Sequence, residues 1–293
     1  MEKLNEPVHT PVTTRTSAIA CIIAAMPEEM APALEILRGA GYSLQPIIPA
    51  PDGISPSPAP LKSLTLAYPP SPAQAPNLAQ PANQPATPLI LAVTGIGFAA
   101  TASTLGWLLA QYDFAALVSI GSAGGLSTAA KVRHVVFGTR YRNGGADGTA
   151  FGYVRGQVPG QPEYFTADLA LLSAATTVAL DNDEIEIYPA EMISSDTFVT
   201  SANVGDMREA FAKAATADME SYAAASVAHQ FGVPFISIRA ISDLCAPPPA
   251  NPDASPEAEQ AASQAEVFHA ELSQVAPLAA ITAIATLTAA RLL

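Results

Sequence analysis

Two acidic residues stand where an apolar run gives way to a predicted helix. The run at residues 18–25 is followed by Met26, Pro27, Glu28 and Glu29. Carboxyl groups give and take protons in general acid–base catalysis, so this pair is a candidate for such chemistry. Proline at the first helical position and acids in the first turn also stabilise a helix by themselves. The segment alone therefore leaves a catalytic and a structural role open.

Two glycine-bearing turns follow predicted strands and bring backbone within reach of a ligand. They are Thr94-Gly95-Ile96-Gly97 and Gly121-Ser122-Ala123-Gly124-Gly125-Leu126. Because glycine permits close approach, each turn can aim N–H groups at a sugar or a base. Neither turn matches a Walker loop or a complete G-x-G-x-x-G pattern. An ordinary strand-to-helix connection is the alternative.

Charged residues also mark the end of one strand and the start of one helix. Arg239 closes a strongly apolar strand and precedes Ser242 and Asp243, while Asp218 and Glu220 open an alanine-rich helix. An unpaired buried charge is costly, so Arg239 needs a carboxylate or a ligand beside it. A structural ion pair and an acidic helix cap are the alternatives to a functional role.

The elements that must position these residues alternate along the chain. Short β-branched runs predict buried strands at residues 18–24, 89–93, 115–119, 132–137, 185–193 and 233–239. Alanine-rich stretches predict helices at residues 27–38, 98–111, 168–180 and 220–231. This alternation predicts a single α/β domain with a central mixed, mostly parallel sheet flanked by helices. Sites in such sheets gather at the carboxyl ends of the strands, where several of the motifs lie.

Two stretches are expected to lie outside the packed domain. Residues 1–17 are mostly polar and predict a flexible N-terminal tail, which leaves residues 18–293 as the domain. Within it, residues 46–88 hold 13 of the 27 prolines, a composition that predicts a loop insertion rich in proline and alanine. Only residues 64–68 in this stretch have the composition of a short strand.

Charge and cysteine content exclude several classes of partner. The formal net charge of −13 repels a nucleic-acid backbone and an anionic membrane alike, so neither is an expected partner. Cys21 and Cys245 form no disulfide framework and no metal-ligand spacing, which favours a reducing, cytoplasmic compartment and predicts no metal site. The apolar end at residues 275–293, interrupted by Pro277 and Arg291, predicts a buried terminal helix and not a membrane span.

Taken in this order, the segments resemble the 5'-methylthioadenosine/S-adenosylhomocysteine nucleosidases of the purine nucleoside phosphorylase superfamily. The resemblance extends from about residue 18 to Asp243, and its most specific stretch is TAFGYVRGQVPG at residues 149–160. SDTFV at residues 195–199 is similar to the family segment that borders the adenine. The implied fold is nucleoside phosphorylase-like. The implied activity is hydrolysis of the N-glycosidic bond of 5'-substituted adenine nucleosides (5'-methylthioadenosine, S-adenosylhomocysteine, 5'-deoxyadenosine) to adenine and the free ribose derivative, without a cofactor.

The resemblance implies a role for three carboxylates. Glu29 is similar to the family's general base for the attacking water, and Asp243 to the acid that protonates adenine N7. Glu220 is similar to the carboxylate that binds the ribose hydroxyls, with Met219 packed beside it. This set suits the reaction, because bond cleavage leaves positive charge on the ribose and negative charge on the departing purine.

Other matching positions are implied to border the substrate. Phe198 is expected to stack on the base and Val199 to contact it through its backbone. Thr94 and Arg239 are expected near the attacking water, and Ser242 is expected to support the acid.

A second copy of the chain is implied by two further positions. Phe151 and Pro159 resemble residues that reach into the pocket of the neighbouring subunit. The resemblance therefore implies a homodimer that binds a small-molecule nucleoside.

The sequence departs from the family pattern at several places. Asp218 stands where the family usually has glutamate, Arg133-His134 replaces a usual Gly-Asp, and Gly148 replaces an aliphatic residue. After Asp243 the similarity fades into residues 244–249, where the family builds part of the pocket for the 5' substituent. The identity of that substituent is therefore left open.

Three other functions compete with this hypothesis. A futalosine or aminofutalosine hydrolase of the same superfamily is the nearest, because of the altered region after Asp243. Phosphorolysis is disfavoured, since phosphate would meet the negative charges of Glu28 and Glu29. A non-catalytic nucleoside-binding protein would share the fold, but it has little reason to keep three carboxylates in one cavity.

Overall fold

The computed structural model describes residues 19–47, 63–70, 88–245 and 256–293. The predicted tail at residues 1–17 lies outside the described residues, as does most of the proline-rich stretch.

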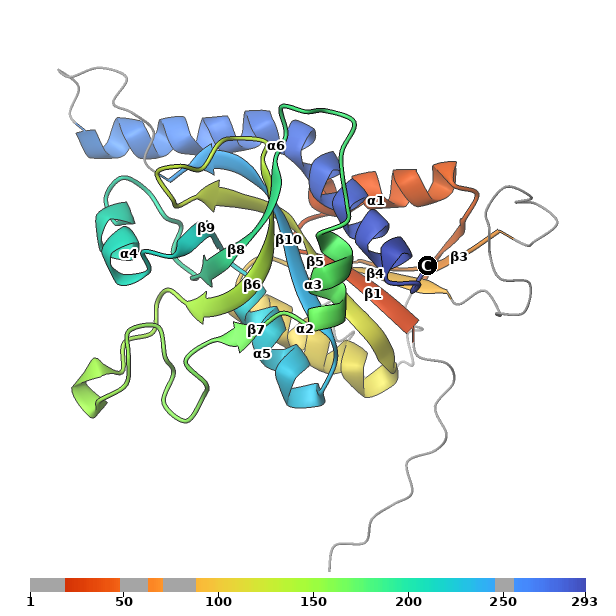
Figure 1. Ribbon diagram of the computed structural model, residues 1–293, viewed down its shortest axis with the longest axis horizontal. Coiled ribbons are helices and arrows are strands. Elements are labelled where there is room, and N and C mark those ends of the chain that lie inside the picture. The colour runs from red at the N-terminus through yellow and green to blue at the C-terminus, as the bar shows by residue number, and fades with distance from the viewer. Residues whose placement is uncertain (1–18, 48–62, 71–87, 246–255) are drawn as a thin grey trace, which may run out of the picture.

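Strands and helices alternate along the described chain (Figure 1). The strands are β1 Ile19–Ala24, β2 Ser43–Pro46, β3 Ser63–Tyr68, β4 Leu89–Val93, β5 Phe114–Gly125, β6 Val135–Asn143, β7 Phe165–Thr166, β8 Ile187–Ser194, β9 Ala214–Asp218 and β10 Phe235–Leu244. The helices are α1 Pro27–Gly39, α2 Phe98–Gln111, α3 Leu169–Ala175, α4 Val204–Ala210, α5 Ser221–Phe231 and α6 Pro256–Ala289, with a 3-10 turn at Thr149–Phe151. Each predicted strand and helix overlaps one of these elements, so the predicted α/β fold is confirmed.

The strands form one mixed sheet in the order β10-β6-β8-β9-β5-β1-β4-β3-β2. Because β10 also pairs with β5, the strands β5, β9, β8, β6 and β10 close into a ring. The strands β4, β1, β5 and β10 pair in parallel with one another, whereas the β10–β6, β5–β9 and β3–β4 pairs are antiparallel. The four parallel strands are buried along almost their whole length, as is typical of strands covered on both faces.

Helices cover the two faces of this sheet. Helix α6 packs against α1 and α3, while α2 packs against α5, and Figure 1 shows α1 and α6 on the side of the sheet opposite α2 and α5. The segment Ala265–Ala289 of α6 is long and apolar enough for a membrane span, but half of its most apolar window is buried inside the fold. Val275, Ala279 and Ala283 are completely buried, so one face of the predicted terminal helix belongs to the core.

The proline-rich stretch is not a single loop. Strand β3 pairs antiparallel with β4 along its length and with β2 on its other side. Leu64 and Ala67 of β3 are buried. The predicted loop insertion at residues 46–88 is therefore wrong at Ser63–Tyr68. The prolines that suggested a loop flank this strand and do not interrupt it, so its ladder of hydrogen bonds can form.

Candidate active site

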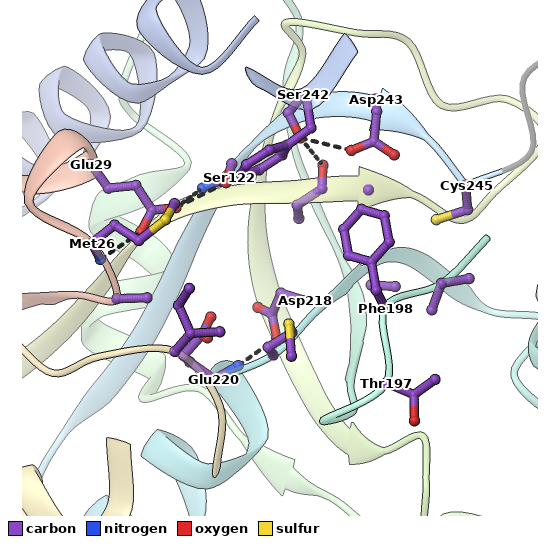
Figure 2. Close-up of a pocket in the computed structure, with 18 of the residues that line it drawn as sticks. Met26, Glu29, Ser122, Thr197, Phe198, Asp218, Glu220, Ser242, Asp243 and Cys245 are labelled. Atoms are coloured by element: carbon purple, nitrogen blue, oxygen red, sulfur yellow. Dashed lines mark hydrogen bonds between the residues drawn. The ribbon is translucent and has the colours of Figure 1, made fainter. Parts of the chain in front are cut away.

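A cavity of about 240 Å³ opens at the carboxyl ends of β5, β9 and β10, beside the start of α1 (Figure 2). Seven of the predicted site residues line it: Glu29, Phe198, Val199, Met219, Glu220, Ser242 and Asp243. These residues come from distant parts of the chain, and the ends of the sheet strands bring them together.

Glu29 lines the cavity and also accepts a hydrogen bond at the start of helix α1. Its side chain is buried, and its Oε1 accepts hydrogen bonds from the backbone N–H and the hydroxyl of Ser122, both at 2.8 Å. Its Oε2 accepts a hydrogen bond from the backbone N–H of Met26 at 3.3 Å, which satisfies a backbone donor at the start of α1. The two roles left open by the sequence are therefore compatible, because one carboxylate caps the helix and lines the cavity.

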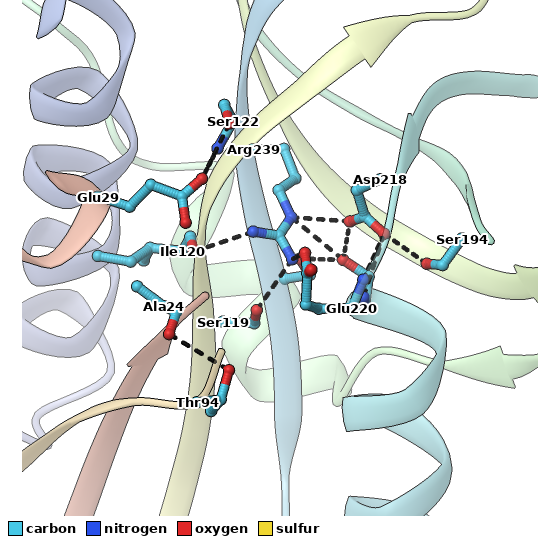
Figure 3. Close-up of polar contacts among 12 residues, drawn as sticks. Ala24, Glu29, Thr94, Ser119, Ile120, Ser122, Ser194, Asp218, Glu220 and Arg239 are labelled. Carbon is cyan, nitrogen blue, oxygen red and sulfur yellow. Dashed lines mark hydrogen bonds and ion pairs between the residues drawn. The ribbon is translucent and has the colours of Figure 1, made fainter. Parts of the chain in front are cut away.

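Gly121 leaves room for the side chains of Glu29 and Arg239, which are both labelled in Figure 3. A Cβ atom at this position would collide with Nη1 of Arg239 and lie 2.6 Å from Oε1 of Glu29. Arg239 is completely buried and donates hydrogen bonds to the carbonyl of Ile120 at 2.9 Å and to the hydroxyl of Ser119 at 3.2 Å. The glycine of this turn therefore makes room for the side chains of the site itself.

Asp218 is the main partner of the buried arginine. Nε of Arg239 donates to Oδ2 of Asp218 at 2.7 Å, and both side chains are almost fully buried. The Oδ1 of Asp218 accepts hydrogen bonds from the hydroxyl of Ser194 at 2.5 Å and from the backbone N–H groups of Glu220 and Ser221. The structural ion pair and the helix cap left open by the sequence are thus both present, and they fix the start of α5 against β10.

Glu220 lies farther from Arg239 than Asp218 does. Its Oε2 lies 3.6 Å from Nη2 of Arg239, and its Oε1 accepts a hydrogen bond from the backbone N–H of Gly97 at 2.9 Å. Burial raises the pKa of Glu220 to about 8; Arg239 opposes this rise, while the charges of Asp218 and Glu29 add to it. The carboxyl group of Glu220 is therefore mostly protonated at neutral pH in the ligand-free protein.

The turn before α2 directs its N–H groups at side chains of the site. The N–H of Gly97 binds Glu220, and the next N–H, that of Phe98, donates to Oδ1 of Asp196 at 2.8 Å. Gly97 has a φ of +91°, and a Cβ atom there would lie 2.7 Å from Oδ1 of Asp196, so this position requires glycine. The sequence suggested a sugar or a base as the target of these N–H groups. In the structure they bind two carboxylates at the positive end of the helix.

Asp243 lies at a β-bulge. The pairing of β10 with β5 passes from Ile241–Ala123 to Asp243–Gly124 and leaves Ser242 without a partner in the register. Consecutive residues of a regular strand point to opposite faces, but the bulge lets both Ser242 and Asp243 line the cavity. Asp243 is buried, and the hydroxyl of Ser242 donates to its Oδ1 at 2.9 Å.

Aromatic side chains form one wall of the cavity. Phe198 is 43% exposed, and its ring centroid lies 6.5 Å from that of Phe268 on α6. The ring of Phe268 in turn lies 5.2 Å from that of His269, and both residues line the cavity. Cys245 also lines it, and burial raises the pKa of this thiol to about 12, which keeps it neutral. A flat, uncharged ring system can stack on such a wall.

Among the described residues, four of the predicted site residues do not line the cavity. Arg239 lies beneath the cavity. Thr94 is buried, and its hydroxyl donates a hydrogen bond to the carbonyl of Gly95 at 2.9 Å. Phe151 and Pro159 are exposed on the segment between β6 and β7. The expectation that Thr94 and Arg239 lie near the attacking water therefore stays a prediction.

Several lining residues were not singled out from the sequence. Met26, Ile96 and Ser122 belong to the noted motifs, but only the fold shows that they face the cavity. Phe268 and His269 carry no sequence signal at all, because α6 brings them to the cavity from far along the chain. Within the described part of the chain, no cluster of His, Cys, Asp or Glu is arranged to hold a metal ion.

Comparisons with known proteins agree with this geometry. The profile of the phosphorylase superfamily matches residues 83–284. The 5'-methylthioadenosine/S-adenosylhomocysteine nucleosidase of Bacillus cytotoxicus is 37% identical over 157 residues, which cover 53% of this chain and 68% of that protein.

Solved structures share the whole architecture. The nucleosidase of the same name from Neisseria meningitidis, in complex with methylthio-immucillin-A, aligns with a TM-score of 0.71 and 26% identity over 92% of this chain and 98% of that chain. The futalosine hydrolase of Helicobacter pylori aligns with a TM-score of 0.72 at 19% identity, covering 92% of this chain and 97% of its own, which shows a common fold. The chain therefore belongs to the 5'-methylthioadenosine/S-adenosylhomocysteine nucleosidase family within the phosphorylase superfamily.

Proposed function

We propose that the protein hydrolyses the N-glycosidic bond of 5'-substituted adenine nucleosides to adenine and the free ribose derivative. One observation carries this proposal: Glu29, Glu220 and Asp243 line a single cavity beside the stacking face of Phe198. The named substrates of its relatives, 5'-methylthioadenosine and S-adenosylhomocysteine, are adenine nucleosides of this class.

Glu29 is the proposed general base. A carboxylate has about four sites that accept hydrogen bonds, and three donors already bind Glu29: two from Ser122 and one from Met26. One site is left for a water molecule in the cavity. A carboxylate in this place can take a proton from that water.

Asp243 is the proposed acid and Glu220 the proposed ribose ligand. A departing purine gains negative charge, and a proton from Asp243 neutralises it. The sugar gains positive charge, which a carboxylate bound to its hydroxyls stabilises. Arg239 then acts from beneath the cavity, where it fixes Asp218 and attracts Glu220.

Substrate binding should release protons if Glu220 binds the ribose as a carboxylate. Its pKa of about 8 in the empty cavity leaves it mostly protonated at pH 7, and two ribose O–H donors favour its ionised form. Calorimetric titration at pH 7 with an uncleaved nucleoside analogue, in buffers of different ionisation enthalpy, should show up to about one proton released per site. Glu220→Gln should release none.

The same group gives stability a pH dependence with a defined sign. The pKa of Glu220 is raised above its unfolded value of 4.5, so its contribution is complete below that value and is lost as pH rises through about 8. Glu220→Gln should therefore raise the Tm of the ligand-free protein at pH 8.5 and leave it nearly unchanged at pH 4.5. An equal Tm difference at both pH values would contradict a buried titrating carboxyl group.

A substrate panel tests the reaction. Release of free base from 5'-methylthioadenosine, S-adenosylhomocysteine, 5'-deoxyadenosine and futalosine should be measured with and without phosphate. We expect turnover of the adenine nucleosides that is independent of phosphate. Preference for futalosine would support the second candidate, which shares the fold. Tight binding of adenosine without any turnover would instead indicate a binding protein.

We further propose a cytoplasmic homodimer in which one protomer completes the cavity of its partner. Phe151 and Val154 are 82% and 45% exposed on the segment between β6 and β7, an arrangement that leaves apolar surface for a second copy. Both cysteines are free and buried, which fits a reducing compartment.

Phe151→Ser should test this assembly. Phe151 is so exposed that the change should leave the Tm of a protomer nearly unaltered. If the ring fills the partner's pocket, the KM for the nucleoside should rise about tenfold or more. Light scattering should give the unaltered chain twice its 30.1 kDa mass. A fully active 30.1 kDa species would overturn the shared site.

A further inference from the structure

Arg133 has an unusual backbone for its residue type. Its φ is +71°, and among the described non-glycine residues only Arg291 shares a positive φ. This conformation is unfavourable for a side chain larger than glycine. A feature that offsets such strain is therefore expected around Arg133.

The backbone of this turn is tied to the strand that carries the proposed acid. The N–H of Arg133 donates to the carbonyl of Ile241 at 2.7 Å, and the N–H of Ile241 donates to the carbonyl of His134 at 2.9 Å. Ile241 immediately precedes the bulge at Ser242. The turn thus holds β10 in place just before Asp243.

The side chain of Arg133 is tied to the cavity wall on α6. Its Nε donates to Oε2 of Glu271 at 2.8 Å and its Nη2 to Oε1 at 3.1 Å, a two-pronged ion pair. Glu271 follows Phe268 and His269, which line the cavity, within one helical turn. Arg133 therefore connects the strand of the acid with the aromatic wall.

This part of α6 has few other anchors. Residues 265–267, 269 and 270 are exposed, and the first buried side chains of the described helix are those of Leu272 and Val275. Pro277 cannot donate a helical hydrogen bond, and α6 changes direction along its length in Figure 1. The section that bears Phe268 and His269 thus extends beyond the packed body of the helix.

We propose that Arg133 is a positioning residue that sets the aromatic wall of the cavity through its ion pair with Glu271. Its backbone hydrogen bond holds the β10 bulge, and its guanidinium holds the exposed section of α6 over the same cavity. The kinetic part of this proposal rests on the proposed nucleosidase function. The structural part, an α6 section ordered by Arg133, does not.

Arg133→Gly separates the two contacts, because glycine keeps the backbone N–H and removes the ion pair. Hydrogen exchange at residues 265–271 should become faster. The KM for 5'-methylthioadenosine should rise about two- to fivefold, the range expected for an exposed ion pair, while kcat stays within about twofold. Arg133→Lys should recover part of the loss, and Glu271→Gln should reproduce it. The double variant Arg133→Gly/Glu271→Gln should add little to either single change.

Arg291→Gly is the matched control. It makes the same substitution at the other positive φ, but no described acidic residue forms an ion pair with Arg291. Both variants relieve strain and loosen the unfolded chain alike, so any difference between their Tm values should reflect the ion pair that only Arg133 makes. Unchanged exchange in Arg133→Gly, or equal changes in both variants, would overturn the proposal. Faster exchange in an enzyme without nucleosidase activity would keep the α6 contact and reject the proposed function alone.

Discussion

Replacing Glu29 with glutamine should lower kcat for nucleoside hydrolysis by about 10²–10⁴ while substrate binding survives. Glutamine has nearly the same size, but it cannot take a proton from the attacking water at neutral pH. Its amide oxygen can still accept both hydrogen bonds of Ser122, so the side chain should keep its place. Steady-state kinetics give kcat, and calorimetric titration with an uncleaved analogue gives Kd.

The neighbouring residue supplies a matched control for this change. Glu28 lies in the same first turn of α1 but is exposed, so Glu28→Gln removes the same charge from the helix start without entering the cavity. Glu28→Gln should retain turnover. Glu29→Gln also loses the acceptor for the Met26 N–H, which costs about 1 kcal/mol of stability and is seen in Tm. Full turnover in Glu29→Gln would leave Glu29 with the helix cap as its only role.

Local signals were enough to predict the elements that carry the site. Helix α2 begins and ends where its pattern predicts, at Phe98 and Gln111, because a glycine turn precedes it and an apolar strand follows. The acids at 29, 220 and 243 lie at strand ends or helix starts, and such positions can be recognised from neighbouring residues alone. The cavity that joins them follows from the rule for strand ends in α/β sheets.

Long-range pairing explains what the sequence did not predict. Strand β9 has the sequence Ala-Ala-Thr-Ala-Asp, which has little β-propensity, and it becomes a strand because β8 and β5 pair with it. Strand β3 does have the composition of a short strand at residues 64–68, but only its pairing with β4 fixes it in the sheet. The place of Phe268 depends on the path of α6 across the fold. None of these contacts leaves a trace in a local window of sequence.

The pairing of Arg239 shows the same limit for side chains. Its sequence context predicts a carboxylate or a ligand beside it but does not say which one. In the structure, Nε of Arg239 lies 2.7 Å from Oδ2 of Asp218, whereas Nη2 of Arg239 lies 3.6 Å from Oε2 of Glu220. Asp218 is therefore the nearer partner of the arginine. Burial raises the pKa of Glu220 and Arg239 opposes this rise, and the sequence alone does not show that Glu220 is buried.

Asp243→Asn should lower turnover of adenine nucleosides by about 10² or more. Asparagine can still donate a hydrogen bond to the departing base but cannot transfer a proton to it. Its side-chain oxygen can accept the hydrogen bond from Ser242, now 2.9 Å from Oδ1, so the bulge in β10 should persist. The loss should therefore appear in kcat, and the Tm should change little.

A second substrate tests whether Asp243→Asn loses turnover because it cannot transfer a proton. A nucleoside analogue whose leaving group departs as a stable anion needs no acid. Asp243→Asn should therefore lower turnover of this analogue much less than turnover of 5'-methylthioadenosine. Ser242→Ala provides the control, because it removes the hydrogen bond to Asp243 and keeps the carboxyl group. It should slow both substrates to a similar, smaller extent. Equal losses on both substrates in Asp243→Asn would mean that Asp243 holds the cavity together and that the proton comes from another group.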